Sequence, residues 1–493
     1  MKMGELASLL VTARLTGDPQ TEITGIQTDS RKVKPGDLFI CLPGHTVDGH
    51  DYAGKALDAG AAALVAERPL GLGAAELLVK DSRLAMAVIA DRYFGHPSAK
   101  VRTIGVTGTN GKTTTTYLIE RILNDAGKSA GVIGTIEMRY AGRVYPMSGT
   151  TPEALELHRH LADMADAGVA YCAMEVSSHG LDQGRAKGVR FRTAIFTNLT
   201  QDHLDYHGTM EQYAAAKSLL FSRLGNGYAA DERDRSYAVL NADDPASAGF
   251  AKATAAEVIT YGVREDADVR ASDIRITARG ASFHVRTFRG EADIQLRMVG
   301  AYNVYNALGA LTAALLEGVP LEAIKASLEA IPGVPGRVET VDAGQDFAVI
   351  VDYAHTPDGL ENVLRTVKEF AERRVICVFG CGGDRDRTKR PIMGRIAARY
   401  ADHVMVTSDN PRSEDPVRIL QDIEAGLRGD GVPADRYDMI VDRREAIRKA
   451  VAMASAGDVV LIAGKGHETY QLIGKETLEF DDRLVAAEAI RGQ

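Results

Sequence analysis

A glycine-rich segment, residues 105–114, carries the clearest chemistry in the chain. It reads Gly-Val-Thr-Gly-Thr-Asn-Gly-Lys-Thr-Thr, between a β-branched run and a helical pattern. A strand, a glycine turn and a helix start cradle nucleotide phosphates, because backbone N–H groups and the positive helix end face the anion. Lys112 would then reach the outer phosphates, and Thr113 would offer its hydroxyl to magnesium. The segment predicts an ATP site.

This segment departs from the common phosphate loop at one position. That pattern has a glycine five residues before Gly111, where this chain has Val106. The predicted loop is therefore a shortened form made of Gly108, Thr109, Asn110, Gly111, Lys112, Thr113 and Thr114. The alternative is a tight turn that only happens to hold a lysine and threonines. The flanking strand and helix patterns favour the phosphate site.

Other apolar runs end in polar clusters. They are Glu175-Val176-Ser177-Ser178-His179, Asn198-Leu199-Thr200-Gln201-Asp202-His203, Asp352-Tyr353-Ala354-His355 and Asp409-Asn410-Pro411-Arg412. Ligands bind open α/β sheets at the carboxyl ends of the strands. One such cluster could be a capped turn, but several in one chain predict two facing sites, one per domain.

Strands and helices that alternate must position these residues. Residues 113–126 have helical spacing, and apolar runs at 171–176, 193–199 and 237–240 are mostly separated by further helical patterns. This order predicts a parallel sheet with helices on both faces. A proline- and glycine-rich linker at 331–336 precedes a second series of β-branched runs, which predicts a second α/β domain.

The bulk composition is that of an ordinary globular protein. The chain has 493 residues, 45% hydrophobic and 25% charged, enough for roughly three domains. Its net charge of −9 argues against general binding to nucleic acid or anionic membranes. No run approaches the ~20 apolar residues of a membrane span. Residues 1–15 have Leu6, Leu9, Leu10 and Ala13 at helical spacing, which favours an amphipathic helix over a signal peptide.

The cysteines are too few and too scattered for a disulfide framework. They are Cys41, Cys172, Cys377 and Cys381. We expect buried free thiols and the reducing cytoplasm as the location.

Taken together, the motifs resemble the Mur ligase family, ATP-dependent amide-forming enzymes of peptidoglycan precursor synthesis in the cell wall. The matching segments occur in the family's order over nearly the whole chain, at 108–114, 175–179, 197–199, 202–205, 241–244, 300–306, 336–337, 352–355 and 464–468. Segments 29–31, 36–39 and 380–390 resemble the members that add the third residue to UDP-N-acetylmuramoyl-L-alanyl-D-glutamate.

The resemblance implies an α/β protein of three domains. These are an N-terminal uridine-binding domain at 1–98, a central phosphate-loop ATPase domain at 99–332 and a C-terminal Rossmann-like, amino-acid-binding domain at 333–493. It also implies ATP and Mg²⁺ as cofactors and a monomer that neither binds nucleic acid nor inserts into membranes. The implied substrates are UDP-N-acetylmuramoyl-L-alanyl-D-glutamate and meso-diaminopimelate, joined through an acyl phosphate.

The resemblance also implies a metal site. Its members are Thr113, Glu175, His203 and Lys217, the last as a carbamate formed with carbon dioxide. Magnesium favours oxygen ligands, so His203 could instead be a helix-capping or core histidine. On spacing alone Lys217 is an exposed helix lysine, and only the resemblance makes it a ligand. With Lys112 and Arg337, His203 and Lys217 form the implied catalytic set.

Further implied contacts fall on both nucleotides. Asn303, Arg337 and Asp352 resemble the residues around adenine, γ-phosphate and ribose, although Arg337 could also be a surface arginine at a domain start. The positions implied for the UDP-linked substrate are Ser30, His45, Thr46, Val47, Thr150, Thr151, Ser177, Gln183 and Arg185.

The segment Asp409-Asn410-Pro411-Arg412 discriminates between amino-acid substrates. Diaminopimelate has one carboxylate more than lysine, and a guanidinium binds a carboxylate with matched charge and geometry. Family members that add diaminopimelate carry this arginine, and Arg385, Gly464 and Glu468 resemble its companions. The alternative is an Asx-Pro turn with a solvated Arg412. The basic positions from Arg385 to Arg399 are expected mostly on a solvated helix surface.

Two other functions fit part of these features. Folylpolyglutamate synthase shares the ATPase domain but has no N-terminal uridine domain. A nucleotide-dependent switch without ligase activity would not need Arg337, Asp352 and Arg412 in a separate domain.

Overall fold

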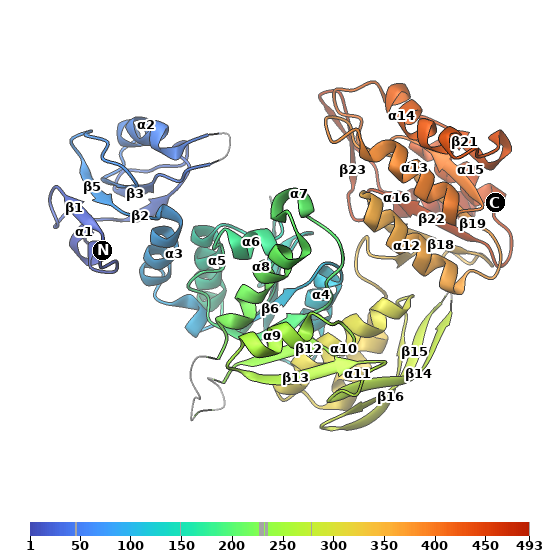
Figure 1. Ribbon diagram of the computed structural model, residues 1–493, viewed down its shortest axis with the longest axis horizontal. Coiled ribbons are helices and arrows are strands. Elements are labelled where there is room, and N and C mark those ends of the chain that lie inside the picture. The colour runs from blue at the N-terminus through green and yellow to red at the C-terminus, as the bar shows by residue number, and fades with distance from the viewer. Residues whose placement is uncertain (45–46, 148, 226–230, 232–234, 278, 493) are drawn as a thin grey trace. The chain divides into compact units, whose positions relative to one another are not determined.

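The computed structural model describes residues 1–44, 47–147, 149–225, 231, 235–277 and 279–492 (Figure 1). Two compact units result. The first comprises Met1–Asp268 and Gly309–Val319, and the second Val269–Leu308 and Pro320–Gln493. Both are mixed α/β. The boundaries expected at residues 98 and 332 stay predictions.

The N-terminal part of the first unit is a five-stranded sheet with the order β1-β5-β4-β3-β2. Its strands are β1 (Arg14–Thr16), β2 (Gly25–Gln27), β3 (Asp37–Ile40), β4 (Ala63–Ala66) and β5 (Ala75–Leu78). Only β1 is antiparallel to its neighbour. The helices are α1 (Met3–Ala7), α2 (Ala53–Asp58) and α3 (Ser82–Tyr93). Leu38, Val65 and Leu77 of the sheet pack with Ile89 of α3.

The expected N-terminal helix is shorter than its spacing suggested. It ends at Ala7, with Ser8 as its C-cap. The chain then reaches β1, whose residues Arg14–Thr16 pair with β5. Pairing in the sheet therefore overrides the helical periodicity from Leu9 to Ala13.

The central sheet of the first unit has the order β13-β12-β11-β6-β10-β7-β8-β9. Six parallel strands come first: β13 (Glu257–Gly262), β12 (Tyr237–Asn241), β11 (Phe191–Phe196), β6 (Arg102–Thr107), β10 (Tyr171–Glu175) and β7 (Ala130–Ile133). The antiparallel strands β8 (Met138–Tyr140) and β9 (Arg143–Tyr145) follow. The parallel strands bring the ends of β6, β10 and β11 to one edge, as expected from the sequence.

Helices of the first unit connect these strands. They are α4 (Lys112–Asp125), α5 (Ala154–Asp166), α6 (Ser178–Asp182), α7 (Leu204–His207), α8 (Met210–Ser222) and α9 (Ser247–Ala253). The core beneath them includes Met174, Phe196 and Phe221, all fully buried.

The second unit begins with an antiparallel meander that the sequence analysis did not anticipate. Its strands are β14 (Val269–Thr277), β15 (Gly280–Thr287) and β16 (Gly290–Leu296). Two helices follow, α10 (Ala301–Leu316) and α11 (Leu321–Ala330). Helix α10 runs through the boundary between the units, since residues 309–319 belong to the first.

The C-terminal sheet has the order β17-β18-β22-β19-β20-β21. Its strands are β17 (Glu339–Thr340), β18 (Ala348–Asp352), β22 (Val459–Ala463), β19 (Val375–Phe379), β20 (His403–Val406) and β21 (Tyr437–Met439). All but β17 run parallel. After β22 the chain forms an antiparallel hairpin, β23 (Tyr470–Ile473) and β24 (Glu476–Glu479).

Side chains of this sheet alternate between two cores. Ile350 and Leu461 pack with α12 (Pro357–Phe370), α13 (Lys389–Tyr400) and α14 (Pro416–Gly429). Val349 and Val460 pack with α15 (Arg443–Met453) and α16 (Asp482–Arg491) on the other face. Strands buried on both sides explain the continuous β-branched runs of the sequence.

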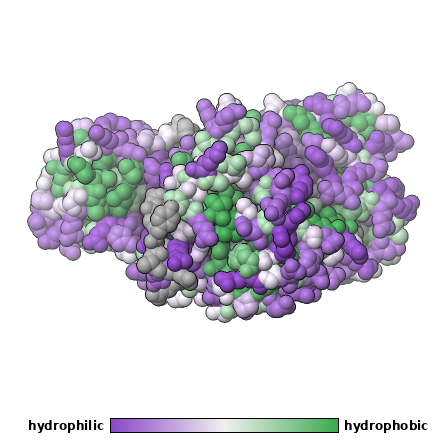
Figure 2. All heavy atoms as spheres, turned by 60° about the horizontal axis from the view of Figure 1, so that its bottom comes forward, coloured by the Kyte–Doolittle hydropathy of each residue, from purple (hydrophilic) through white to green (hydrophobic). Residues whose placement is uncertain are grey.

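The cysteines are free and buried, as expected. Burial raises the pKa of each thiol to about 12. Among the helices of the described residues, none combines the length and apolar character needed to cross a membrane. In Figure 2 hydrophilic side chains cover much of the visible face, and hydrophobic atoms form separate areas between them.

Candidate active site

The glycine-rich segment has the predicted strand, loop and helix form. Strand β6 ends at Thr107 and α4 begins at Lys112. Gly108 and Gly111 have φ values of 148° and 86°, in the region that favours glycine. A Cβ on Gly108 would lie 1.9 Å from Thr197 Oγ1, so only glycine fits there.

Residues that follow β11 hold the loop in place. Thr109 N donates to Asn198 O at 2.8 Å, and Asn110 N donates to Asn198 Oδ1 at 2.9 Å. Thr197 Oγ1 donates to Asn110 O at 2.6 Å. The Thr197-Asn198 motif therefore fixes the conformation of the phosphate loop from the neighbouring strand.

Two lysines converge on one carbonyl of this loop. Lys112 Nζ donates to Gly108 O at 2.9 Å, and Lys217 Nζ donates to the same oxygen at 2.9 Å. Lys217 belongs to α8 and is 1% exposed, so spacing alone misjudged it as a surface residue. Its Nζ also lies 4.3 Å from the centre of the Tyr213 ring.

The surroundings of Lys217 disfavour its charged form. Burial, reinforced by the positive charge of Lys112, holds the pKa of Lys217 well below its usual range. Asp202 acts in the opposite direction. A neutral amine at this position is a nucleophile, which is the property that carbamate formation requires.

Glu175 ends β10 and is 1% exposed. Its Oε1 accepts from Thr135 N at 2.8 Å, and its Oε2 accepts from Thr135 Oγ1 at 3.0 Å. A Cβ on Gly134 would lie 2.4 Å from Oε1, so glycine is needed next to this carboxylate. Thr135 was missed by sequence reasoning, because one threonine after a short strand carries no distinctive signal.

His203 is the N-cap residue of α7 and has a left-handed φ of 54°. Its ring centre lies 4.8 Å from that of His179, and Nε2 lies 3.4 Å from Asp202 Oδ2. Burial lowers the pKa of His203, and the charges of Lys112 and Lys217 act in the same direction. His203 therefore lies within the electrostatic influence of Lys112 and of Lys217 in α8.

The expected metal ligands stay a prediction. In the described part of the chain, no three His, Cys, Asp or Glu side chains group so as to hold a metal ion. The expected set has only Glu175 and His203 of these types, and its other donors are a hydroxyl and a carbamate. Glu175 and Thr113 offer the hard oxygen donors that magnesium prefers, so the donor chemistry fits.

The residues expected around the dipeptide form a connected group after β10 and before α5. Thr151 Oγ1 lies 3.1 Å from Ser177 Oγ and donates to Glu175 O at 3.1 Å. Arg185 donates to Thr151 O at 2.9 Å and to Gln183 Oε1 at 2.8 Å. Thr150 Oγ1 lies 3.1 Å from Thr135 Oγ1. Hydrogen bonds and chain neighbours thus link the five expected positions into one network that includes Thr135 and Glu175.

The expected uridine contacts are described in part. Ser30 lies in the turn after β2, between Asp29 and Arg31, which form an ion pair of 2.8 Å. Val47 is exposed and accepts a hydrogen bond from Gly44 N. His45 and Thr46 lie outside the described residues.

In the second unit, Arg337 lies just before β17, and Asp352 is the last residue of β18. Asp352 accepts from Val338 N and Ala354 N, each at 2.8 Å. Burial raises the pKa of Asp352, while Arg337 acts against the shift. The Arg337 guanidinium lies 5.3 Å from the centre of the Tyr353 ring. Asn303 is 1% exposed in α10 and donates to Val299 O at 2.8 Å.

The segment Asp409-Asn410-Pro411-Arg412 follows β20. Arg412 has a left-handed φ of 52°, which is uncommon for a residue with a side chain. Its backbone N donates to Leu472 O at 3.0 Å, and its side-chain Nη1 donates to Gly383 O at 2.8 Å. The segment is therefore not simply an Asx-Pro turn with a solvated arginine, because Arg412 is half-buried and anchored by these hydrogen bonds.

Asn410 and Glu468 are joined directly. Asn410 Nδ2 donates to Glu468 Oε2 at 2.9 Å, and Lys465 Nζ donates to both residues at 3.1 Å. Lys465 is fully buried, and the sequence analysis did not select it. These contacts bring the segments 409–412 and 464–468 together, as expected.

Two glycines, Gly382 and Gly383, allow their segment to lie close to the Asp409–Arg412 segment. A Cβ on Gly383 would lie 1.9 Å from Pro411 O, and one on Gly382 would lie 2.8 Å from Arg412 Nη1 and 3.7 Å from Arg385 Cγ. Arg385 itself is exposed. The basic stretch is mostly solvated as expected, with one exception: Arg390 is fully buried between Glu414 and Asp422.

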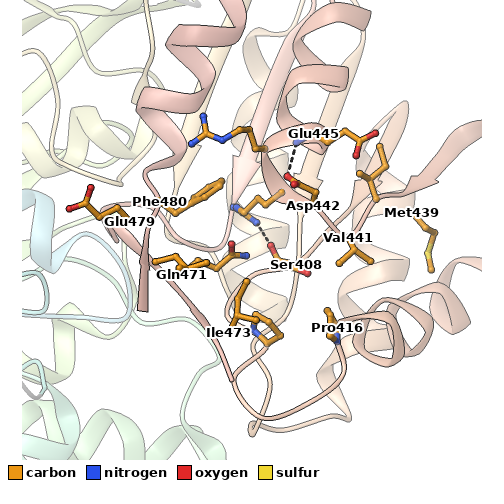
Figure 3. A pocket seen from close by; sticks show the side chains of 15 residues that line it. Ser408, Pro416, Met439, Val441, Asp442, Glu445, Gln471, Ile473, Glu479 and Phe480 are labelled. Carbon is orange, nitrogen blue, oxygen red and sulfur yellow. Dashed lines mark hydrogen bonds between the residues drawn. The ribbon is translucent and has the colours of Figure 1, made fainter. Parts of the chain in front are cut away.

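A cavity of about 790 Å³ adjoins the Asp409–Arg412 segment (Figure 3). Ser408, Pro411 and Gln471 line it, and Gln471 donates to Asp409 O at 2.7 Å. Its other walls come from Pro416 of α14, from residues 439–445 and from the β23–β24 hairpin with Phe480.

Three family models match the chain. They describe the Mur ligase family catalytic domain at residues 22–93, the Mur ligase middle domain at 106–314 and the Mur ligase glutamate ligase domain at 336–466. Together they cover the predicted phosphate loop, Glu175 and the Asp409–Arg412 segment.

Two curated relatives and one solved structure carry the same name. A UDP-N-acetylmuramoyl-L-alanyl-D-glutamate–2,6-diaminopimelate ligase of Geobacillus kaustophilus is 55% identical over 475 residues, 96% of each chain. One of Geobacillus thermodenitrificans is 54% identical over 100% of this chain and 99% of its own. A solved structure of an enzyme with this name has a TM-score of 0.73 at 36% identity and covers 100% and 99% of the two chains.

Proposed function

Because the chain belongs to the Mur ligase family, we propose that it joins meso-diaminopimelate to UDP-N-acetylmuramoyl-L-alanyl-D-glutamate at the expense of ATP. The observation that carries this proposal is the 55% identity, over 96% of both chains, to a relative named for that reaction. The reaction belongs to peptidoglycan precursor synthesis.

The chemistry requires activation of a carboxylate. An oxygen of the D-glutamyl carboxylate attacks the γ-phosphorus of ATP, ADP leaves, and an acyl phosphate forms. The diaminopimelate amine then attacks the acyl carbon, loses a proton and releases inorganic phosphate. Both steps concentrate negative charge, so the site must supply cations and backbone N–H donors.

We assign the nucleotide phosphates to the loop between β6 and α4. Lys112 and the first N–H groups of α4 would bind them, as at other helix N-termini. Thr113, Glu175 and His203 would hold Mg²⁺ together with a carbamate on Lys217. When bound, such an ion supplies charge neutralisation at phosphate oxygens. Asn303, Arg337 and Asp352 are assigned to adenine, γ-phosphate and ribose.

Carbamate formation at Lys217 is supported by its burial and its lowered pKa. The neutral amine would attack the carbon of carbon dioxide, form an N–C bond and give up a proton to solvent. The product would place a negative charge beside Lys112, where the neutral amine carries none. That change adds an attraction between the two side chains and creates an anionic oxygen donor.

We assign the amino-acid substrate to Arg385, Asp409, Asn410, Pro411, Arg412, Gly464 and Glu468. Arg412 would bind the distal carboxylate of diaminopimelate, and Glu468 the distal ammonium. The contacts of Asn410 with Glu468 and Lys465 support this assignment, because they bring the two segments together. The UDP-linked dipeptide is assigned to Ser30, His45, Thr46, Val47, Thr150, Thr151, Ser177, Gln183 and Arg185.

An amide-forming assay with diaminopimelate and L-lysine side by side tests the function. We expect phosphate release only when ATP, the UDP-linked dipeptide and diaminopimelate are all present. Phosphate release with a folate substrate and glutamate would favour folylpolyglutamate synthesis. Release without any amino acid would favour a nucleotide switch. A monomeric state and a cytoplasmic location are part of the proposal.

A further inference from the structure

We propose that Arg443, together with Asp482, is a positioning residue that fixes the two segments of the diaminopimelate site relative to each other. The inference rests on the proposed function, since it takes 409–412 and 464–468 as that site. Neither Arg443 nor Asp482 belongs to the motifs that the sequence analysis selected.

The Arg443 guanidinium joins the ends of two strands. Its Nη1 donates to Ser408 O at 3.2 Å, seen as the dashed line at Ser408 in Figure 3. Its Nη2 donates to Ala463 O at 3.1 Å. Ser408 immediately precedes Asp409, and Ala463 immediately precedes Gly464. One side chain therefore bonds the backbone next to both segments.

Asp482 fixes the guanidinium from the other side. Arg443 Nε donates to Asp482 Oδ1 at 2.8 Å, and Nη2 donates to Oδ2 at 2.7 Å. Both side chains are fully buried, and they begin helices α15 and α16. The two-pronged pair sets the orientation of the guanidinium, and only a planar fork can serve the carboxylate and two carbonyls together.

The contact between the two segments is close enough for this spacing to matter. A Cβ on Gly464 would lie 2.6 Å from Asp409 Oδ2. Beyond the backbone, Asn410 must reach Glu468 and Lys465 with hydrogen bonds of 2.9 and 3.1 Å. A shift of either strand end would change these contacts and the groups assigned to the substrate.

Replacing the whole pair separates positioning from stability. Removing one partner of a buried ion pair leaves the other charge buried without a partner, which lowers stability. Replacing both partners with apolar residues of similar volume is often neutral for stability. We therefore choose the double variant Arg443→Met with Asp482→Leu, and Arg443→Lys as a second variant that keeps the charge. Neither can donate to Ser408 O and Ala463 O as the guanidinium does.

The matched control is a similar pair at the opposite edge of the same sheet. Arg374 binds Asp458 at 2.6 Å, just before β19 and β22 begin, and Asp458 is fully buried. The double variant Arg374→Met with Asp458→Leu removes an arginine–aspartate pair far from the carboxyl ends of the strands, although Arg374 is 45% exposed whereas Arg443 is fully buried.

Two readouts are measured on the full chain. The first is KM for diaminopimelate against KM for ATP. The second is the hydrogen exchange of the Arg412 and Gly464 amides, which bond to Leu472 O and Asp352 O. For both Arg443 variants we expect KM for diaminopimelate to rise about ten- to a hundredfold. KM for ATP should stay near the wild-type value, and the two amides should exchange faster. The control should show neither effect.

Two results would overturn the inference. One is wild-type KM for diaminopimelate and wild-type exchange in a folded Arg443 variant. The other is a parallel rise of both KM values, which indicates general loosening. If the double variant does not fold, Arg443→Lys decides by the same criteria. If the wild-type protein forms no amide with diaminopimelate, the proposed function fails, while the exchange data still decide whether Arg443 positions the segments.

Discussion

Lys112 donates to two carbonyls of its own loop, those of Gly108 and Thr109, at 2.9 and 2.7 Å. These contacts hold its charge where β6 ends and do not contribute to a hydrophobic core. Lys112→Ala should therefore lower amide formation by at least about a hundredfold and leave the melting temperature nearly unchanged. Steady-state turnover and a thermal melt check this. Wild-type turnover in the variant would contradict the ATP assignment.

Lys217 offers a test of the carbamate. Lys217→Ala should be nearly inactive, because the anionic oxygen donor is lost. Added short carboxylic acids should restore part of the activity, since they can enter the space left by the side chain and supply the missing oxygen. The activity of the folded variant is measured with and without acetate or formate. A folded variant that no acid rescues would argue for an unmodified lysine.

Arg412 should decide between amino-acid substrates. Arg412→Ala removes the partner of the distal carboxylate, which typically costs about 2–5 kcal/mol, or roughly 30-fold to several thousandfold in kcat/KM. Lysine lacks that carboxylate, so its poor use should change little. Arg412→Lys should restore activity only partly, because an ammonium cannot bind in two prongs. If Arg412→Ala keeps the wild-type preference for diaminopimelate, Arg412 is not the selector.

Single residues also show the limit of sequence reasoning. The need for glycine at positions 108 and 111 could be predicted, because it follows from the local backbone conformation, while their contact with ATP stays a prediction. The burial of Lys217 could not be read from α8 alone, since its partner Gly108 O is 109 residues away. Arg443 was missed for the same reason, because its partners are the carbonyl of Ser408 after β20, the carbonyl of Ala463 at the end of β22 and one carboxylate of α16.

At the scale of elements, the buried strands of both parallel sheets were predicted well. The runs at 171–176, 193–199 and 237–240 overlap β10, β11 and β12, and the polar clusters lie at or after the ends of β10, β11, β18 and β20. Buried parallel strands leave long apolar runs, which are easy to detect. The β14–β16 meander was missed because its strands are polar on one face and lack such runs.

The loop that follows β22 should respond to pH through His467. Burial, reinforced by Arg337 and Arg483, lowers the pKa of His467 from 6.5 to about 4. Between these values the unfolded chain binds the proton and the native chain does not. Stability should therefore fall as the pH drops through that window, by at most about 1.4 kcal/mol per pH unit from this group.

His467→Gln removes that contribution, because glutamine does not titrate. Its urea unfolding midpoint should decline less than that of the wild type between about pH 6.5 and 4. Differences between the two proteins are compared at each pH, so that other titrating groups cancel. Equal slopes for both proteins would show that His467 takes up its proton in the native chain at its ordinary pKa.

For the whole molecule, the family and the reaction followed from the order of many weak motifs, and relatives that match the full chain confirm the family. Each motif alone fits a turn or a capped strand. Their order over 361 residues, from 108 to 468, is specific because it requires two α/β regions in sequence. The residues around Ser30, by contrast, have no strong pattern, and their role rests on resemblance.

Arg337 supports a prediction about the phosphoryl-transfer step. The phosphate loop belongs to the first unit, and Arg337 belongs to the second. If Arg337 acts on the γ-phosphate, its charge is needed during phosphoryl transfer and less for binding ATP to the loop. Arg337→Ala should then lower kcat by about 10²–10³-fold with a much smaller change in KM for ATP.

The matched control is Arg365→Ala, which removes an exposed arginine from α12 of the same unit and should keep wild-type kinetics. Single-turnover formation of ADP separates the chemical step from product release. Arg337→Lys should be intermediate, because it keeps the charge without the planar fork. A wild-type rate of ADP formation in folded Arg337→Ala would show that the first unit supplies the charge for phosphoryl transfer without Arg337.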